Sequence, residues 1–211
     1  MNITLFGATG KTGILLIQRA LEDGHHITVY ARTPAKLSMK HENLTIVQGE
    51  LAELNHIEKA VKNADAVISV LGPTTDTKGL VIADGTKNII SAMKKNGAKR
   101  LIATATPSFK DKKDRFQFGY AFAVLMVKSL MKTAYLNIVK TGSLIIKSEL
   151  DWTIVRLPML SDKPKGGKLH IGYPGHGTVN LFSLSRADLA SFLLDQIEDR
   201  TYLHQSPVIS N

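Results

Sequence analysis

The chain of 211 residues contains no cysteine. This absence excludes disulfide bonds and thiolate chemistry, and it fits a reducing compartment. Long hydrophobic runs are also missing, since the longest one, at 121–127, is too short to cross a bilayer. The first expected strand begins at Asn2, which leaves no room for a signal peptide. We therefore expect a soluble, cytoplasmic protein with no membrane partner.

Acidic residues are fewer than basic ones, 18 against 27, and the formal net charge is +9 at pH 7. Nucleic-acid binding requires a concentrated basic patch. Here the lysines are spread along the chain, and the clusters at 110–115 and 163–165 are interrupted by acids, proline or glycine. We expect these clusters to be solvated loops, or the rim of an anionic ligand site, and we expect no nucleic-acid partner. No group of His, Asp and Glu has the spacing of a metal site, so no metal is expected.

The most informative feature that is present is a glycine-rich turn at Gly7, Gly10 and Gly13. It follows the apolar segment 3–5 and leads into the helical pattern 14–17. Strand, glycine turn and helix in this order predict a dinucleotide-binding site, with the helix N-terminus facing the pyrophosphate. Gly7 permits the tight turn, Gly10 lets the backbone approach the phosphates, and Gly13 lets the helix pack closely. The alternative is a tight strand–helix connection without a ligand.

Strand and helix signals alternate along the whole chain. Strands are expected at 3–5, 26–30, 44–47, 66–71, 100–104 and 152–156, with a short edge strand at 207–210. Ser185 is the expected N-cap of a last helix. The pattern predicts an α/β fold, a single Rossmann-like domain with a doubly wound parallel sheet whose ligands lie beyond the carboxyl ends of the strands. Two substrate-side insertions are expected, at about 106–144 and 159–184.

The end of the second strand indicates which nucleotide is bound. An Asp or Glu normally accepts hydrogen bonds from the adenosine ribose at this position. This chain has no acid between Tyr30 and Lys36. Arg32 and Lys36 instead offer two cations to a 2′-phosphate, which predicts NADP(H) as the cofactor in preference to NAD(H). The alternative is a surface loop with two ordinary charges.

With these residues the chain resembles the atypical short-chain dehydrogenase/reductase group. Within that group it is similar to the NAD(P)H-binding proteins of the NmrA-like and biliverdin reductase B (flavin reductase) type. The resemblance covers nearly the whole chain. Its carriers are the glycine turn Gly7–Gly13, Arg32-Thr33 with Lys36, Gly49–Leu51, Asp65–Pro73, Leu150–Arg156 and Ser185–Ala190.

The resemblance implies a set of cofactor-binding residues in addition to the three glycines. It places the phosphates at Thr9, Lys11 and Thr12, and the 2′-phosphate at Arg32 and Lys36. It places the adenine near Glu50 and Leu51, and the ribose and nicotinamide along Leu71, Gly72 and Pro73. The family usually has Gly-Asp where this chain has Gly49-Glu50, so the resemblance does not fix the detail of the adenine contact.

The sequence offers no strong catalytic base. No tyrosine has a lysine four residues later, and Tyr135 and Lys140, five apart, point about 140° away from each other on a helix. Tyr135 is therefore a packing residue or, alternatively, a proton donor. Thr106, just past the fifth strand, lies where biliverdin reductase B-like proteins tend to carry serine. Its hydroxyl either donates to the substrate or bonds to local backbone, and Ser108 is the neighbouring alternative.

Three further features leave alternatives open. The aromatic residues between 109 and 120 either stack on a planar anionic acceptor or belong to the core. His170 and His176 are expected to be surface or hydrogen-bonding residues rather than proton shuttles. The apolar run 121–127 is a dimer surface, a surface for a regulatory protein partner, or core.

The predicted function is an NADPH-dependent reductase that transfers hydride to a small conjugated acceptor such as a flavin, quinone or tetrapyrrole. The cofactor supplies this chemistry, while the protein supplies proximity and orientation. The alternative is a non-catalytic NAD(P)-binding redox sensor that acts through a protein partner. The missing Tyr–Lys dyad fits both functions.

Overall fold

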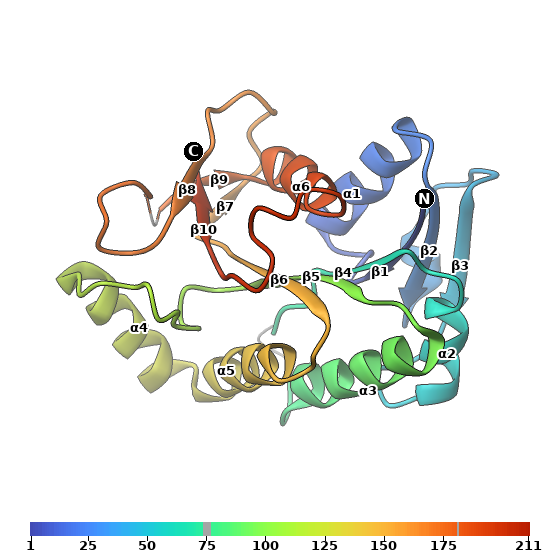
Figure 1. Ribbon diagram of the computed structural model, residues 1–211, viewed down its shortest axis with the longest axis horizontal. Coiled ribbons are helices and arrows are strands. Elements are labelled where there is room, and N and C mark those ends of the chain that lie inside the picture. The colour runs from blue at the N-terminus through green and yellow to red at the C-terminus, as the bar shows by residue number, and fades with distance from the viewer. Residues whose placement is uncertain (74–76, 181) are drawn as a thin grey trace.

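The computed structural model of the protein describes residues 1–73, 77–180 and 182–211. A central sheet is covered by helices on both faces (Figure 1). Its elements before the middle of the chain are β1 (Asn2–Phe6), α1 (Lys11–Glu22), β2 (His26–Ala31), a 3₁₀ turn (Pro34–Lys36), β3 (Leu44–Gln48), α2 (Leu54–Val61), β4 (Ala66–Ser69) and α3 (Val81–Asn96). They are followed by β5 (Arg100–Ala105), α4 (Phe118–Leu130), α5 (Lys132–Ile146), β6 (Asp151–Arg156), β7 (Leu160–Ser161), β8 (His170–Gly172), β9 (Leu184–Ser185), α6 (Arg186–Asp195) and β10 (Val208–Ser210).

The main sheet has the strand order β3-β2-β1-β4-β5-β6-β10-β8. All neighbouring strands pair in parallel except β10 and β8, which are antiparallel. From β1 the chain first builds outward to β3 and then returns to place β4 on the other side of β1. The predicted doubly wound, Rossmann-like sheet is confirmed, and its strand order reverses between β1 and β4.

Two apolar layers hold the helices on the sheet. On one face, α1 and α6 pack together and bury Leu16, Ile17 and Leu193 against the strands. On the other face, α2, α3 and α5 cover a second core that includes Ile89 and Ile145. α6 begins where the sequence predicts, because the Ser185 hydroxyl accepts a hydrogen bond from the Ala187 N–H at 3.2 Å.

Two strand predictions differ from the structure. The segment 207–210 was expected at the edge of the sheet, but β10 lies between β6 and β8. Pro207 is tolerated because it precedes the strand, and β8 supplies an outer partner that has no strong sequence signal of its own. β4 also ends at Ser69 rather than at residue 71. The apolar residues that follow leave the sheet and become part of the site described below.

The two segments expected as insertions contain helices and short strands, some of which belong to the core of the fold. Segment 106–144 contains α4 and most of α5; α5 packs on α3, whereas α4 projects at one end of the molecule (Figure 1). Segment 159–184, apart from residue 181, which lies outside the described residues, contains β7 and β8, and β7 pairs with β9. Their role on the substrate side stays a prediction.

Within the described residues, no single helix is long and apolar enough to cross a membrane. α4 and α5 meet those criteria only as a pair, and the pair is bent by 114°.

Candidate functional site

A groove of about 580 Å³ lies beyond the carboxyl ends of β1, β2 and β4, where the strand order reverses. This is the position at which doubly wound sheets bind ligands. Eight of the predicted site residues line it: Gly7, Thr9, Gly10, Arg32, Lys36, Leu51, Leu71 and Gly72. The structure therefore brings the glycine turn, the end of β2 and the segment after β4 into one groove.

The glycine turn is shaped by close backbone contacts. Gly7 has a left-handed φ of +87°, and a Cβ at this position would lie 2.9 Å from the carbonyl carbon of Val70. A Cβ on Gly13 would lie 2.5 Å from the Gly7 carbonyl oxygen and 2.6 Å from the Ala8 Cα. Both positions thus exclude a side chain, and the first turn of α1 can pack directly on the loop. Gly13 does not line the groove itself; it sets the position of the helix.

The N-terminus of α1 is open toward an anion. The first backbone hydrogen bond of the helix runs from the Ile14 N–H to the Gly10 carbonyl at 3.0 Å. The earlier N–H groups have no acceptor within a helix, and they carry its partial positive charge. Gly10 is the N-cap residue and has no side chain to occupy these donors. The arrangement is suited to bind a pyrophosphate.

The groove is cationic. Arg32 and Lys36 line it from the end of β2, and Lys78 lines it from the segment before α3. No aspartate or glutamate is among the described lining residues. Neither Arg32 nor Lys36 has an ion-pair partner in the described part of the chain. The sequence does not predict Lys78 as a binding residue, because a single lysine in a loop gives no signal of its position. Only the fold places it beside the groove.

Two other predicted binding residues lie outside the groove lining. Lys11 is exposed, and its ammonium binds the Asp162 carboxylate at 2.5 Å. This hydrogen bond, together with Arg186, holds the pKa of Asp162 below its usual range. The Glu50 side chain is exposed, while its backbone carbonyl accepts a hydrogen bond from the Tyr30 hydroxyl at 2.7 Å. Their contacts with the cofactor stay predictions.

Tyr30 lines the groove and holds the adjacent loop at Glu50 in place. Burial, and then the carboxylates of Glu53 and Glu50, raise the pKa of Tyr30 to about 12. The phenol therefore stays neutral at physiological pH, and its hydroxyl donates a hydrogen bond to the Glu50 carbonyl. This bond fixes the loop that carries Gly49 and Leu51, both of which line the groove.

A second cavity of about 180 Å³ adjoins the groove. The two share Val70, Leu71, Gly72 and Ile82 in their walls, so they are connected at the segment after β4. We call this second cavity the chamber. The remaining predicted site residues Thr12, Pro73 and Thr106 line it.

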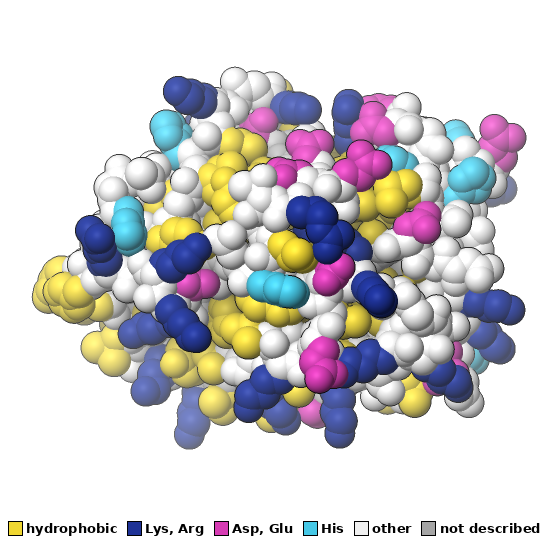
Figure 2. Space-filling model, viewed as in Figure 1, with side chains coloured by type: hydrophobic (Ala, Val, Ile, Leu, Met, Phe, Trp, Pro, Cys, Tyr) yellow, Lys and Arg dark blue, Asp and Glu magenta, His cyan; other side chains and the backbone are white. Residues whose placement is uncertain are grey.

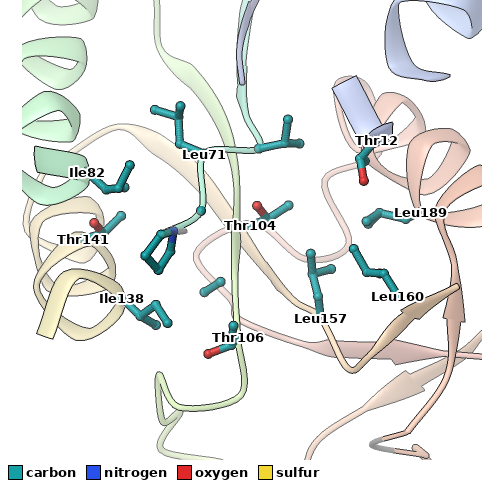
Figure 3. A pocket seen from close by; sticks show the side chains of 14 residues that line it. Thr12, Leu71, Ile82, Thr104, Thr106, Ile138, Thr141, Leu157, Leu160 and Leu189 are labelled. Carbon is teal, nitrogen blue, oxygen red and sulfur yellow. The ribbon is translucent and has the colours of Figure 1, made fainter. Parts of the chain in front are cut away.

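The chamber is apolar apart from four threonine hydroxyls. Figure 3 shows Leu157, Leu160 and Leu189 on one side and Ile82 and Ile138 on the other, with Thr104 between them. No ionisable side chain is among its described lining residues, which also include Ala105 and Thr141. Among the described residues, the side chains that line the chamber are uncharged, and their polar groups are hydroxyls.

The threonine hydroxyls differ in their partners. Thr104 donates weakly to the Ser69 carbonyl at 3.5 Å, and Thr106 accepts from the Ser108 N–H at 3.4 Å. Thr141, on α5, is buried at its hydroxyl and has no hydrogen-bond partner among the described residues. Sequence reasoning missed Thr141, since only the packing of α5 on α3 turns it toward the chamber. Ser108 is buried and does not line the chamber.

The residues considered as proton donors elsewhere lie apart from the chamber. The Lys140 ammonium is 3.4 Å from the Asp84 carboxylate, whereas the ring of Tyr135 lies 5.9 Å from the Lys128 ammonium. Tyr135 and Lys140 therefore form no dyad. His176 binds the Lys113 carbonyl at 2.8 Å and, like His170, does not line either cavity.

The aromatic residues between 109 and 120 do not form one stacking surface. Phe109 is buried against Gly142 of α5, and Tyr120 is buried and donates to the Pro107 carbonyl. Phe116 and Phe118 are exposed to solvent. None of the four lines the chamber. Two are core residues and two lie on the surface, so the stacking alternative loses its basis.

A buried ion pair fixes the segment that follows Thr106. Arg156, at the end of β6, is fully buried, and its guanidinium binds both carboxylate oxygens of Asp114 at 2.7 Å. It also donates to the carbonyls of Ser206 at 2.6 Å and Phe109 at 3.1 Å. The loop beside the chamber is thus attached to the sheet by a fully paired charge. From the sequence, Arg156 belongs to the sixth expected strand and to a motif that carries the resemblance, and nothing indicates its pairing with Asp114.

The chain is similar to known NAD(P)H-binding proteins. A family model described as NAD(P)H-binding matches residues 7–200, which is most of the chain. The chain belongs to this NAD(P)H-binding family. The predicted relationship to short-chain dehydrogenase/reductase-like proteins is confirmed, and the family consists of NAD(P)H-dependent oxidoreductases with reductases among the relatives of this chain.

Curated relatives of this NAD(P)H-binding protein are distant and longer. The 2-alkyl-3-oxoalkanoate reductase of Stenotrophomonas maltophilia is 23% identical over 92% of this chain and 64% of its own length. The photosystem II assembly factor Ycf39 of Synechocystis sp. is 25% identical over 74% of this chain and 44% of its own length. The chain spans about a third to two thirds of the length of the curated relatives it matches.

Solved structures show the same fold over the whole chain. A short-chain dehydrogenase/reductase from Veillonella parvula in complex with NADP has a TM-score of 0.81 at 20% identity, covering 100% of this chain and 94% of that one. ChuY, an anaerobillin reductase from Escherichia coli O157:H7, has a TM-score of 0.80 at 20% identity, covering 100% and 97%.

Proposed function

We propose that the chain is an NADPH-dependent reductase that transfers hydride to an apolar, conjugated acceptor held in the chamber. The proposal depends on one observation, namely that the cationic groove and the uncharged chamber meet at Val70–Gly72. In NADPH the phosphates are charged, whereas the reduced nicotinamide ring is neutral. The two cavities match this division.

The described residues fit an NADP(H) molecule in the groove. The open N-terminus of α1 and the glycine turn would hold the pyrophosphate, and Arg32 and Lys36 would hold the 2′-phosphate. Lys78 would add a third cation. No acid is among the described lining residues at the end of β2, where one usually binds an unmodified ribose, and this favours NADPH over NADH.

The nicotinamide ring supplies hydride when the cofactor is bound. The chain's own residues then bind and orient the acceptor. Leu71 and Gly72 would guide the ring into the chamber, whose leucine and isoleucine walls exclude water and favour a flat apolar acceptor. The chamber volume of about 180 Å³ suits one ring system beside the nicotinamide, so the rest of a larger acceptor would lie outside it.

The proton source limits the class of acceptor. The described chamber residues include no acid, histidine, lysine or tyrosine. A simple ketone needs a strong proton donor when it accepts hydride, whereas a flavin, quinone or tetrapyrrole spreads the added negative charge and can take its proton from water or a weak hydroxyl donor. We therefore propose a conjugated acceptor, with Thr106 or Thr141 orienting its polar atom.

An NADPH-oxidation assay against flavins, quinones and linear tetrapyrroles tests the proposal. We expect turnover well above the rate without protein for at least one class. Ala105→Leu narrows the chamber and should lower turnover while the affinity for NADPH stays within a few fold. Ala123→Leu, on the exposed side of α4, adds the same atoms far from the site and is the matched control. Equal turnover in both variants would contradict the chamber as the acceptor site.

A second candidate function is a non-catalytic redox sensor that acts through a protein partner. The name of one relative, a photosystem II assembly factor, favours it, as does the lack of an ionisable side chain among the chamber residues that the structure describes. Tight NADPH binding without turnover against every acceptor class would support the sensor and contradict the reductase.

A further inference from the structure

An exposed apolar stripe runs along α4. Its members recur at helical spacing on the side that faces solvent: Phe118, Phe122, Leu125, Met126 and Leu130. Phe118 is 77% exposed and Leu130 is 74% exposed. The residues between them on this side are Gly119, Ala123 and Ser129, so the stripe contains no charged residue.

The opposite side of α4 attaches the helix to the protein. Tyr120 is buried and donates a hydrogen bond to the Pro107 carbonyl, and Val124 and Val127 are half-buried. The outward orientation of the stripe is therefore fixed by packing. Soluble monomers rarely expose a continuous apolar surface of this kind without a binding role.

Positive charge flanks the stripe, and α4 itself contains no acidic residue. The sequence has no Asp or Glu from Arg115 to Ser148. Lys110, Lys112 and Arg115 precede α4, and Lys128 and Lys132 lie at its end. None of these five cations forms an ion pair within the described residues.

Two acids lie among the cations that precede α4. Asp114 is paired with the buried guanidinium of Arg156, whereas Asp111, which accepts a hydrogen bond from the neutral Ser206 hydroxyl, keeps its charge and offsets one of these cations. Figure 2 shows hydrophobic side chains at the end of the molecule where Figure 1 places α4, with Lys and Arg side chains beside them.

From this combination we propose that α4 docks on an anionic lipid surface. The stripe would enter the boundary between headgroups and acyl chains, and the flanking cations would contact the headgroup phosphates, as in helices that lie in the membrane interface. This proposal replaces the expectation from the sequence that the protein has no membrane partner. It is independent of the proposed reductase activity.

Charge favours a lipid surface over a second copy of the chain. A symmetric dimer through α4 would bring the cations of both copies together, because each copy presents the same surface to the other. The segment from Arg115 to Ser148 of either copy offers no acid to pair with them. An anionic membrane neutralises them.

Flotation of the full chain with lipid vesicles tests the proposal. We expect binding to phosphatidylcholine vesicles that contain one third phosphatidylglycerol to be at least about tenfold tighter than binding to phosphatidylcholine alone, and to weaken with salt. The double substitution Phe122→Ser with Leu125→Ser should lower binding by roughly tenfold or more. Phe182→Ser, at a phenylalanine that is also 77% exposed but lies elsewhere, is the matched control and should leave binding unchanged.

The absence of cysteine allows a site-specific probe. Phe118→Cys and Phe182→Cys place one thiol each at positions that are both 77% exposed. An environment-sensitive dye should shift to shorter emission wavelength on anionic vesicles at position 118 and not at position 182. Thermal unfolding midpoints equal to that of the unsubstituted chain confirm that the variants are folded.

Three results would overturn the proposal. The first is no flotation with anionic vesicles. The second is flotation that the double substitution leaves unchanged, since overall charge alone would then explain it. The third is a dimer in light scattering that the double substitution converts to monomer, which would make a second copy the occupant of the stripe.

Discussion

The preference for NADPH can be tested at two exposed lysines of one loop, of which one lines the groove and the other does not. Lys36 lines the groove, whereas Lys40, four residues later and also exposed, does not. Arg32 lines the groove from the same loop. If the three positions have the roles that the geometry assigns, removing charge at 32 or 36 should weaken NADPH binding, and removing it at 40 should not.

The magnitude follows from the exposure of these groups. A charge-assisted hydrogen bond contributes about 1.5–3 kcal/mol, but exposed ion pairs contribute only about 0.2–1 kcal/mol. The groove is open to solvent, so we take about 1 kcal/mol per cation. This corresponds to a roughly fivefold higher Kd for Arg32→Ala or Lys36→Ala, and about twenty- to thirtyfold for the double variant.

Fluorescence titration with NADPH and NADH measures both affinities. NADH lacks the 2′-phosphate, so its Kd should change by less than about twofold in either variant. High salt should reduce the NADPH preference of the unsubstituted chain, because the Debye length falls to about 3 Å at 1 M. Equal losses for both nucleotides, or a loss at Lys40→Ala as large as at Lys36→Ala, would refute the assignment.

Further predictions concern packing, charge and the chamber. Gly13→Ala forces a Cβ into the turn backbone and should lower the free energy of unfolding by about 1–3 kcal/mol in urea, whereas Gly119→Ala, which has open space, should raise it by about 0.5–1 kcal/mol. Asp114→Ala leaves a buried guanidinium unpaired and should cost about 3–5 kcal/mol; a loss below about 1 kcal/mol would mean that the pair is solvated. A hydrogen bond from Arg200 lowers the pKa of Asp151 in the folded state. The ionised Asp151 carboxylate therefore stabilises the fold above about pH 4, and this stabilisation is lost as pH falls through the folded-state pKa. The difference in unfolding free energy between the unsubstituted chain and Asp151→Asn should therefore shrink toward zero in acid. Thr141→Val removes an unpartnered hydroxyl and should not lower the melting temperature, but it should lower turnover if that hydroxyl orients the acceptor.

Much of the fold could be predicted from local sequence. The alternation of apolar strands and helical segments fixed the parallel sheet, because each segment buries its side chains with its own period. The glycine turn was readable for a similar reason. Gly7 needs a left-handed φ, and Gly13 allows no Cβ, so both leave a signal within a few residues of the strand and helix that they join.

The edges of the sheet were less predictable. β10 was expected as an edge strand, but β8 covers it from a segment with no strong strand pattern. The pairing of two short strands depends on where the rest of the chain holds them, and it is not encoded within either one.

The sequence by itself determined the nucleotide-binding class of this protein, since the turn residues and the cations after the second strand are local features. Only the tertiary structure decided which further residues line the groove and the chamber and which residues hold the adjoining loop in place. The roles of Lys78, Thr141 and the Asp114–Arg156 pair depend on residues far along the chain that the fold brings beside them. The apolar run in α4 could have been core, but packing of α5 on α3 leaves α4 at one end of the molecule, where no sheet face remains to cover its stripe.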